Sequence, residues 1–169
     1  MNIAIFGYSG FIGSHISKIL NNKHNVIKAN ARGIKHNSSD EEIFDHFEKV
    51  LIKPDFIFNF CANTNPKNKN DIFINENLSS LIEKYINKKK LNTQFFHIST
   101  INVLIKERLD KYTISKKNAE INLTDKFTSI IRLPLIINFD DGKKGDLEIL
   151  YKYINLKVIP FYPMIYPGN

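Results

Sequence analysis

A phenol and an amine lie four residues apart in the segment 112–116, Tyr-Thr-Ile-Ser-Lys. Positions i and i+4 of a helix share one face, so a helix here makes Tyr112 and Lys116 neighbours. An ammonium beside a phenol favours the phenolate, and we expect a lowered pKa for Tyr112. Such a tyrosine can give or take a proton while a hydride moves to or from a carbonyl carbon. Because this spacing also arises by chance on helices, the pair indicates this chemistry only together with other motifs.

Two hydroxyl side chains, Ser99 and Thr100, follow residues 94–98, a run of strand type. A hydroxyl at the carboxyl end of a strand can hydrogen-bond the carbonyl oxygen on which the tyrosine would act. The alternative is a cap or a turn, which Ser and Thr also favour. The five histidines show no metal-ligand spacing with one another or with Cys61, so we expect no metal site and interpret them as structural: His15, His24, His36, His46 and His97.

Three glycines mark a turn between an apolar run at 2–6 and helically spaced apolar residues at 11–20. Gly7 would permit a sharp turn, Gly10 a close approach of backbone to ligand, and Gly13 tight packing of helix on strand. The N-terminus of such a helix suits phosphates, and we predict a dinucleotide-binding turn. A plain turn is the alternative, because the spacing is G-x-x-G-x-x-G rather than G-x-G-x-x-G.

Arg32 lies just after the next apolar run, at 25–30, and no Asp or Glu occurs between 25 and 39. An acidic residue near this strand end would bind the ribose hydroxyls of NAD, whereas an arginine accommodates the 2′-phosphate of NADP. The position of Arg32 therefore favours NADP over NAD. The alternative is a solvated loop arginine.

Strand-type and helix-type patterns alternate along the chain, which predicts an α/β fold with a doubly wound parallel sheet and helices on both faces. After the opening unit we expect strands at 25–30, 33–37, 55–60, 94–98, 127–137 and 157–161, and helices from Asp40 to Leu51 and at 71–90, 113–123 and 146–154. At 169 residues the chain fits one domain, 1–169, with a sizeable core.

The composition is ordinary for a soluble globular protein, with 43% hydrophobic and 24% charged residues. We expect no membrane span and no signal peptide, since no apolar run approaches about 18 residues and no basic region precedes the first strand. The single cysteine, Cys61, excludes an internal disulfide and fits the cytoplasm. The net charge is +7, but the lysines are scattered, which argues against nucleic-acid binding.

Five motifs occur in one order: GYSGFIGSH at 7–15, PDFIFNFCA at 54–62, ISTINV at 98–103, YTISKKNAE at 112–120 and RLP at 132–134. They resemble the TGxxGFIGSH, PDxVxHxAA, catalytic-hydroxyl, YxxSKxxAE and arginine-strand motifs of the extended short-chain dehydrogenase/reductase family. That family has a Rossmann fold and includes sugar-nucleotide epimerases, dehydratases and ketoreductases. Asn75 falls near the family's structural asparagine.

The resemblance implies roles for the site residues. Tyr112 would be the acid/base, Lys116 would lower its pKa and hold the nicotinamide ribose, and Thr100 would orient the carbonyl. The residues implied in cofactor binding are Gly7, Ser9, Gly10, Phe11, Ile12, Gly13, Arg32, Phe60, Cys61, Ala62, Asn75, Ser99, Tyr112, Lys116 and Pro134. The implied partner is a nucleotide sugar, as in polysaccharide biosynthesis, and homodimerisation through two long helices is compatible with the family.

Three departures from the family bear on activity. Thr113 stands where a glycine is common, the 12 positions from Thr100 to Tyr112 are fewer than usual, and the chain ends at Asn169, so we expect a truncated chain without most of the substrate domain. The short loop and Arg32 favour a reductase among NAD(P)-dependent oxidoreductases and epimerases. A non-catalytic dinucleotide-binding redox sensor or scaffold is the alternative, against which the Tyr112–Lys116 pair argues.

Overall fold

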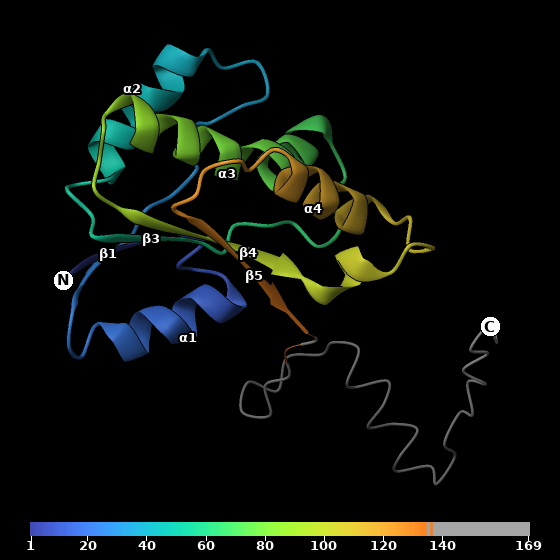
Figure 1. Cartoon of the computed structure of the whole chain (residues 1–169), viewed down its shortest axis with the longest axis horizontal. Helices are drawn as coiled ribbons and strands as arrows, with labels where there is room; N and C mark the ends of the chain where they lie inside the picture. The colour runs from blue at the N-terminus through green and yellow to red at the C-terminus, as the bar shows by residue number, and fades with distance from the viewer. Residues whose placement is uncertain (135, 137–169) are drawn as a thin grey trace, which may run out of the picture. The chain divides into compact units, whose positions relative to one another are not determined.

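Five parallel strands form one sheet in the order β2-β1-β3-β4-β5 (Figure 1). This computed structural model describes residues 1–134 and 136. The strands are β1 (Asn2–Phe6), β2 (Asn25–Ile27), β3 (Phe56–Asn59), β4 (Gln94–Thr100) and β5 (Thr128–Leu133). The helices are α1 (Phe11–Leu20), α2 (Asp40–Val50), α3 (Lys69–Lys88) and α4 (Lys111–Ile121), with a 3₁₀ turn, η1 (Ile101–Leu104).

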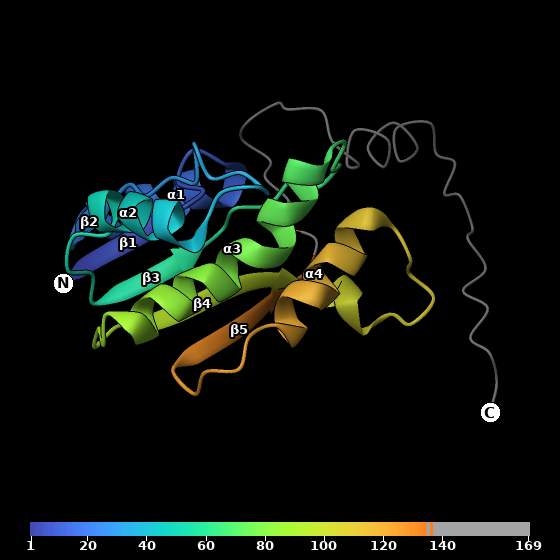
Figure 2. The same ribbon diagram turned by 90° about the horizontal axis from the view of Figure 1, so that it is seen from above.

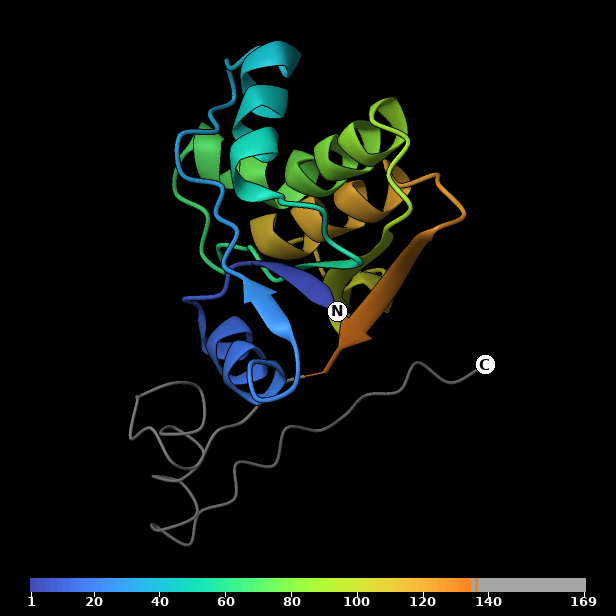
Figure 3. The ribbon, with the colours of Figure 1, turned by 90° about the vertical axis from the view of Figure 1, so that its left-hand side faces the viewer.

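The helices cover both faces of the sheet. The connection from β1 to β2 runs in one direction along the sheet, and the later connections run in the other. Because crossovers between parallel strands are right-handed, the two directions place their helices on opposite faces. Figure 3 shows α1 on one face and α2, α3 and α4 on the other. The predicted α/β doubly wound fold is therefore confirmed.

The strand order reverses beside β1, which pairs with β2 on one side and with β3 on the other. The chain leaves β1 for β2 and returns past β1 to β3. In open α/β sheets, ligands bind outside the carboxyl ends of the strands at such a reversal. The carboxyl ends of β1 and β3 are therefore where the fold itself favours a site.

Aromatic rings join the central strand to two helices in the core. The rings of Phe6 on β1 and Phe47 on α2 meet edge to face with centroids 5.8 Å apart, and Phe47 meets Tyr85 on α3 at 5.5 Å. All three side chains are buried. Their burial ties β1, the strand that precedes the glycine turn, to the α2–α3 face of the sheet.

The predicted helices and strands agree with the observed ones within a few residues wherever the structure describes them, with one exception. No strand forms at 33–37: Gly33 adopts a φ of +94°, and the amides of Ile34 and Ser38 donate to carbonyls within the loop, at Ala31 and Lys35. The strand expected at 25–30 is also short, because the Ala29 amide turns back to the Ile27 carbonyl.

Residues Met1–Pro134 form one compact unit. The helix expected at 146–154 and the strand expected at 157–161 lie outside the described residues, so a single domain over 1–169 stays a prediction. Within the described part of the chain, no helix is long and apolar enough to cross a membrane.

Candidate active site

The glycine turn closes as a tight backbone loop between β1 and α1. Gly7 has a φ of +76°, a left-handed conformation that favours glycine, and the Gly10 amide donates to the Gly7 carbonyl at 2.9 Å. A Cβ at Gly13 would lie 2.1 Å from the Gly7 oxygen. The expected roles of Gly7 in the turn and of Gly13 in close packing are therefore confirmed, whereas the approach of Gly10 to a ligand stays a prediction.

The N-terminus of α1 carries no side-chain cap. Its N-cap residue is Gly10, and its first turn holds no acidic residue. By contrast, side chains cap the N-termini of α2, α3 and α4, where the capping residues are Ser39, Asn68 and Asp110. The first amides of α1 thus have no side-chain acceptor of this kind, and they lie at the positive end of the helix dipole. This is the arrangement that a phosphate needs.

The loop after β3 packs directly against the glycine turn. The Phe60 amide donates to the Phe6 carbonyl at 3.0 Å, and a Cβ at Gly7 would lie 2.8 Å from the Cys61 nitrogen. Phe60 and Cys61 are half-buried, and Ala62 is exposed. The structure thus brings together the two predicted cofactor segments, 7–13 and 60–62, at the reversal of strand order.

Asn75 of α3 links this loop to α4. Its side chain is buried, accepts from the Asn63 amide at 2.8 Å, and donates to the Asn63 carbonyl at 2.9 Å and to Ser115 Oγ at 3.1 Å. Figures 1 and 2 show α3 and α4 side by side on one face of the sheet. Asn75 therefore holds the loop after β3 and the helix that bears Tyr112 in a fixed relation.

The two hydroxyl groups at the end of β4 differ in their contacts. Thr100 Oγ1 accepts from the Asn102 amide at 3.3 Å and caps η1. Thr100 therefore forms a helix cap, which is the alternative role expected for it from the sequence. Ser99 Oγ is buried and has no hydrogen-bond partner among the described residues. Both residues lie at the carboxyl end of β4, as expected.

Helix α4 starts at Asp110 and presents Tyr112 and Lys116 from consecutive turns. The Asp110 carboxylate accepts from the Thr113 amide at 2.9 Å and from Thr113 Oγ1 at 2.7 Å. The threonine that departs from the family pattern is thus fully buried and fastens the first turn of this helix. Because α4 contacts β4 and η1, it lies above the strand end that carries Thr100.

Lys116 is buried, with 2% of its surface exposed. Burial lowers its pKa to about 8, and the charges of Cys61 and Glu120 act in the opposite direction. Burial raises the pKa of the Cys61 thiol to about 11, and the Lys116 charge opposes that shift. Lys116 of α4 and Cys61 of the loop after β3 therefore lie near enough for their charges to interact.

The expected lowering of the pKa of Tyr112 is wrong for this structure. Burial raises its pKa, and the negative charge of Asp110 raises it further. The spacing of Tyr112 and Lys116 could not reveal either effect, because both depend on how the start of α4 packs and is capped. Tyr112 is accordingly a phenol at neutral pH.

The remaining predicted residues lie in the glycine turn, at the start of α1 and after strands β2 and β5. Arg32 is exposed in the turn after β2, where its amide donates to Asn30 Oδ1 at 3.0 Å. Pro134 is exposed after β5, Ser9 and Phe11 are exposed in the glycine turn and at the start of α1, and Ile12 is half-buried. Arg132 of the arginine-strand motif pairs with Glu120 of α4, 2.7 Å apart.

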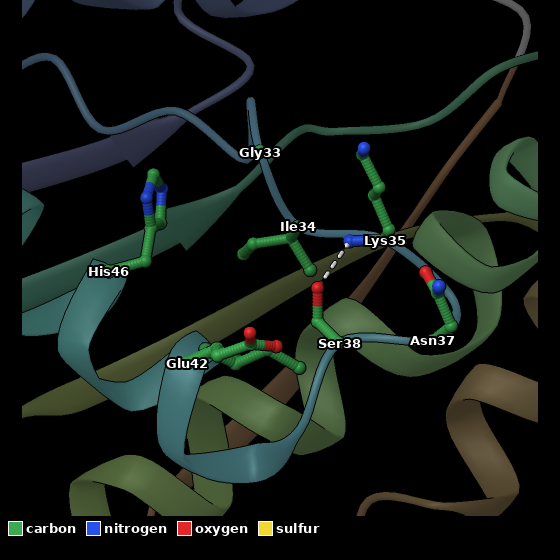
Figure 4. A pocket seen from close by; sticks show the side chains of 8 residues that line it. Gly33, Ile34, Lys35, Asn37, Ser38, Glu42 and His46 are labelled. Atoms are coloured by element: carbon green, nitrogen blue, oxygen red, sulfur yellow. Dashed lines mark hydrogen bonds between the residues drawn. The ribbon is translucent and has the colours of Figure 1, made fainter.

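A pocket of about 410 Å³ lies between the loop 33–38 and α2, and no predicted site residue lines it. Figure 4 shows Lys35 and Ser38 on the loop, with Ser38 pointing toward the Lys35 backbone, and Glu42 and His46 on α2. The Lys35 amide donates to Ser38 Oγ at 3.2 Å, and His46 Nε2 donates to the Asn30 carbonyl at 2.7 Å. Among residues 1–134 and 136, no group of three or more His, Cys, Asp or Glu side chains comes together to hold a metal.

No protein-family model and no curated protein matches the chain. Solved structures resemble it. A hypothetical dTDP-4-dehydrorhamnose reductase from Sulfolobus tokodaii has 24% identity and a TM-score of 0.67, covering 90% of this chain and 61% of its own. The Bordetella bronchiseptica enzyme WbmG, solved with NAD and UDP, has 14% identity and a TM-score of 0.67. The match covers 92% of this chain and 60% of that enzyme's chain.

A dTDP-4-dehydrorhamnose reductase from Bacillus anthracis, in complex with NADP, has 13% identity and a TM-score of 0.68 over 92% of this chain and 60% of its own. The chain thus spans about three fifths of the length of these proteins. At these identities, the likeness shows that the chain has a Rossmann-type fold.

Proposed function

We propose that the chain forms the dinucleotide-binding part of an NAD(P)-dependent oxidoreductase or epimerase that acts on a nucleotide sugar. One observation carries this proposal: the loop that holds Cys61 packs against the glycine turn before the uncapped N-terminus of α1, and the buried Lys116 lies near enough to Cys61 for their charges to interact. A helix end for the diphosphate and a buried amine for the nicotinamide ribose suit two parts of a dinucleotide.

The described residues fit a dinucleotide. The diphosphate would lie at the first amides of α1, where glycines leave room and no side chain caps the helix. Arg32, exposed after β2, would bind the 2′-phosphate of NADP, and we propose NADP over NAD on this ground. The similar proteins solved with NADP, and with NAD and UDP, support this class of ligand. When bound, the nicotinamide would supply or accept the hydride.

Three side chains would act on the substrate. Lys116 would hold the nicotinamide ribose, and Tyr112 would exchange a proton with the oxygen on the reacting carbon. Thr100 Oγ1 accepts from the Asn102 amide through a lone pair, so its own O–H could donate to that same oxygen. Because its pKa is raised, Tyr112 keeps its proton at neutral pH, and this is the form that reduction of a keto sugar requires.

The first test is a fluorescence titration of the purified chain with NADPH and NADH. We expect tighter binding of NADPH, and Arg32→Ala should weaken NADPH binding about tenfold or more while NADH binding stays unchanged, since a charge-assisted phosphate contact is lost. Lys23→Ala, an exposed change after α1 that removes the same charge, is the control. Preference for NADH would remove the role of Arg32, and binding of neither would contradict the proposal.

A second test concerns turnover of a nucleotide-linked keto sugar. Tyr112→Phe should abolish oxidation of NADPH and keep its binding, because only the phenolic hydroxyl group is removed. The second candidate is a non-catalytic dinucleotide-binding module, which the raised pKa of Tyr112 and the capping role of Thr100 favour. Binding without turnover in the unmodified chain would support that module.

We also propose a homodimer, which sedimentation equilibrium would detect.

A further inference from the structure

A chain of hydrogen bonds runs between the sheet and α3 and ends at His97. The Cys61 amide donates to Asn59 Oδ1 at 2.9 Å, Asn59 Nδ2 donates to Ser79 Oγ at 2.8 Å, and Ser79 Oγ lies 2.5 Å from His97 Nδ1. Asn59 and His97 are register partners on β3 and β4, and Ser79 reaches them from α3. All of the side chains that form this chain are buried.

The first bond fixes the direction of the others. A backbone amide can only donate, so the Asn59 oxygen faces Cys61 and its NH₂ group must donate to Ser79. The Ser79 hydroxyl then has its own proton for His97 Nδ1. His97 therefore carries its proton on Nε2.

The imidazole is neutral in this position. Burial lowers the pKa of His97 to about 3, and the Lys116 charge acts in the same direction. His97 is 0% exposed, and its Nε2 has no hydrogen-bond partner among the described residues. A buried N–H without a partner costs about 1–3 kcal/mol, so folded proteins usually pair such groups with protein or with ordered water.

Two other buried residues, Ser99 and Lys116, carry polar groups on the same side of the sheet. Ser99 Oγ is buried without a partner, and its side chain lies on the same face of β4 as His97, two residues along the strand. Lys116 comes down from α4 onto this face and lies near enough to His97 for their charges to interact. An N–H donor, an ammonium and a hydroxyl thus meet in a region that excludes bulk solvent.

We propose that these three groups hold one buried water molecule beneath α4. The water oxygen accepts from His97 Nε2–H and from the Lys116 ammonium, and the water donates to Ser99 Oγ. Three partners are typical of buried water. His97 and Ser99 then fix the position of Lys116 through the water. The site does not depend on the proposed function, because all of its partners are groups of this chain.

NMR of the full chain with ¹⁵N-labelled histidine tests the site without dinucleotide or turnover. Long-range ¹H–¹⁵N correlations should show His97 as the Nε2–H tautomer, and its shifts should not change between pH 7 and 5, where Lys116 also keeps its charge. His97→Gln assigns the signal, and His46→Gln is the control. A cross-peak from His97 Hε2 to water should appear with the sign of a bound molecule. The Nδ1–H tautomer, a cross-peak to protein protons alone, or an Hε2 signal lost to exchange would each overturn the proposal.

Ser99→Ala removes the group that accepts from the water. We expect the His97 Hε2 resonance to shift and its water cross-peak to weaken at least twofold. Ser129→Ala on β5 is the matched control, because Ser129 is the register partner of Phe96 and therefore lies on the opposite face of the sheet. An unchanged His97 spectrum in Ser99→Ala would contradict the water site, and so would equal effects of the two variants.

Discussion

Asn75 and Ser115 join α3 to α4 through a hydrogen bond of 3.1 Å from Asn75 Nδ2 to Ser115 Oγ. Ser115 Oγ also donates to the Tyr112 carbonyl at 2.7 Å. The other contacts of Asn75 are the amide and carbonyl of Asn63, in the loop after β3. One buried amide thus sets the position of the helix turn that carries Tyr112 relative to the loop that abuts the glycine turn.

We expect Asn75→Ala to lower the free energy of unfolding by about 2–3 kcal/mol, since three hydrogen bonds of roughly 1 kcal/mol each are lost. Urea denaturation measures this loss. Hydrogen exchange of the Asn63 amide, whose acceptor is removed, should accelerate by at least tenfold. Asn92→Ala, at an exposed loop position, is the control. Unchanged exchange at Asn63 would show that the loop does not depend on this side chain.

Lys116 makes stability depend on pH in a definite direction. Burial lowers its pKa from 10.5 to about 8. Below pH 8 the lysine binds its proton in both the folded and the unfolded chain, and the cost of burying the charge is fully present. Between pH 8 and 10.5 the unfolded chain keeps a proton that the folded chain has lost, so this lysine makes stability rise with pH.

Lys116→Met should therefore be more stable than the unmodified chain at pH 7, by roughly 3 kcal/mol for a shift of this size. The difference should shrink as the pH rises through 8 toward 10.5. Cys61 and Tyr112 titrate in both proteins, so comparing the two cancels most of their contribution. Urea denaturation at a series of pH values measures the difference. A constant difference over this range would mean that the lysine keeps its usual pKa.

Local chemistry made much of the fold predictable. The start of α1 follows from glycines at positions where no side chain fits, and α2 begins at Ser39 because Ser39 and Glu42 form a reciprocal cap. The predictions from sequence are wrong where tertiary contacts determine the local structure or the pKa. The loop 33–37 bonds to itself rather than to β2, and the pKa of Tyr112 depends on burial and on Asp110.

The chain of buried hydrogen bonds from Asn59 through Ser79 to His97 could not be predicted either. His97 lies among apolar residues of a strand, a pattern that indicates a structural residue. Its partners Asn59 and Ser79 come from another strand and from a helix. Only the packing of α3 on the sheet brings them together, and no periodicity in the sequence encodes which polar residues will meet.

Glu83 of α3 anchors the connection between α4 and β5. Its buried carboxylate accepts from the amides of Thr124 and Asp125 at 3.0 and 3.1 Å and from Thr128 Oγ1 at 2.6 Å. We expect Glu83→Ala to lower the free energy of unfolding by about 3 kcal/mol, because several charge-assisted bonds are lost at a buried site. Exchange of the Thr124 and Asp125 amides should accelerate.

The exposed neighbour on the same helix, Lys84, provides the control. Lys84→Ala should change the free energy of unfolding by less than about 0.5 kcal/mol. A small effect of Glu83→Ala, comparable to that of Lys84→Ala, would show that water replaces the carboxylate without loss and that the connection before β5 holds by packing alone.

Gly13 and Gly33 each require a glycine, but for different reasons. A Cβ at Gly13 would lie 2.1 Å from the Gly7 oxygen, whereas a Cβ at Gly33 would meet nothing within 4 Å but has a φ of +94°. Gly13→Ala must push α1 away from the turn, and we expect it to cost about 3 kcal/mol or more. Gly33→Ala should cost only about 1–2 kcal/mol, the penalty for a left-handed backbone. Thermal and urea unfolding measure both, and equal costs would contradict the close contact between α1 and the turn.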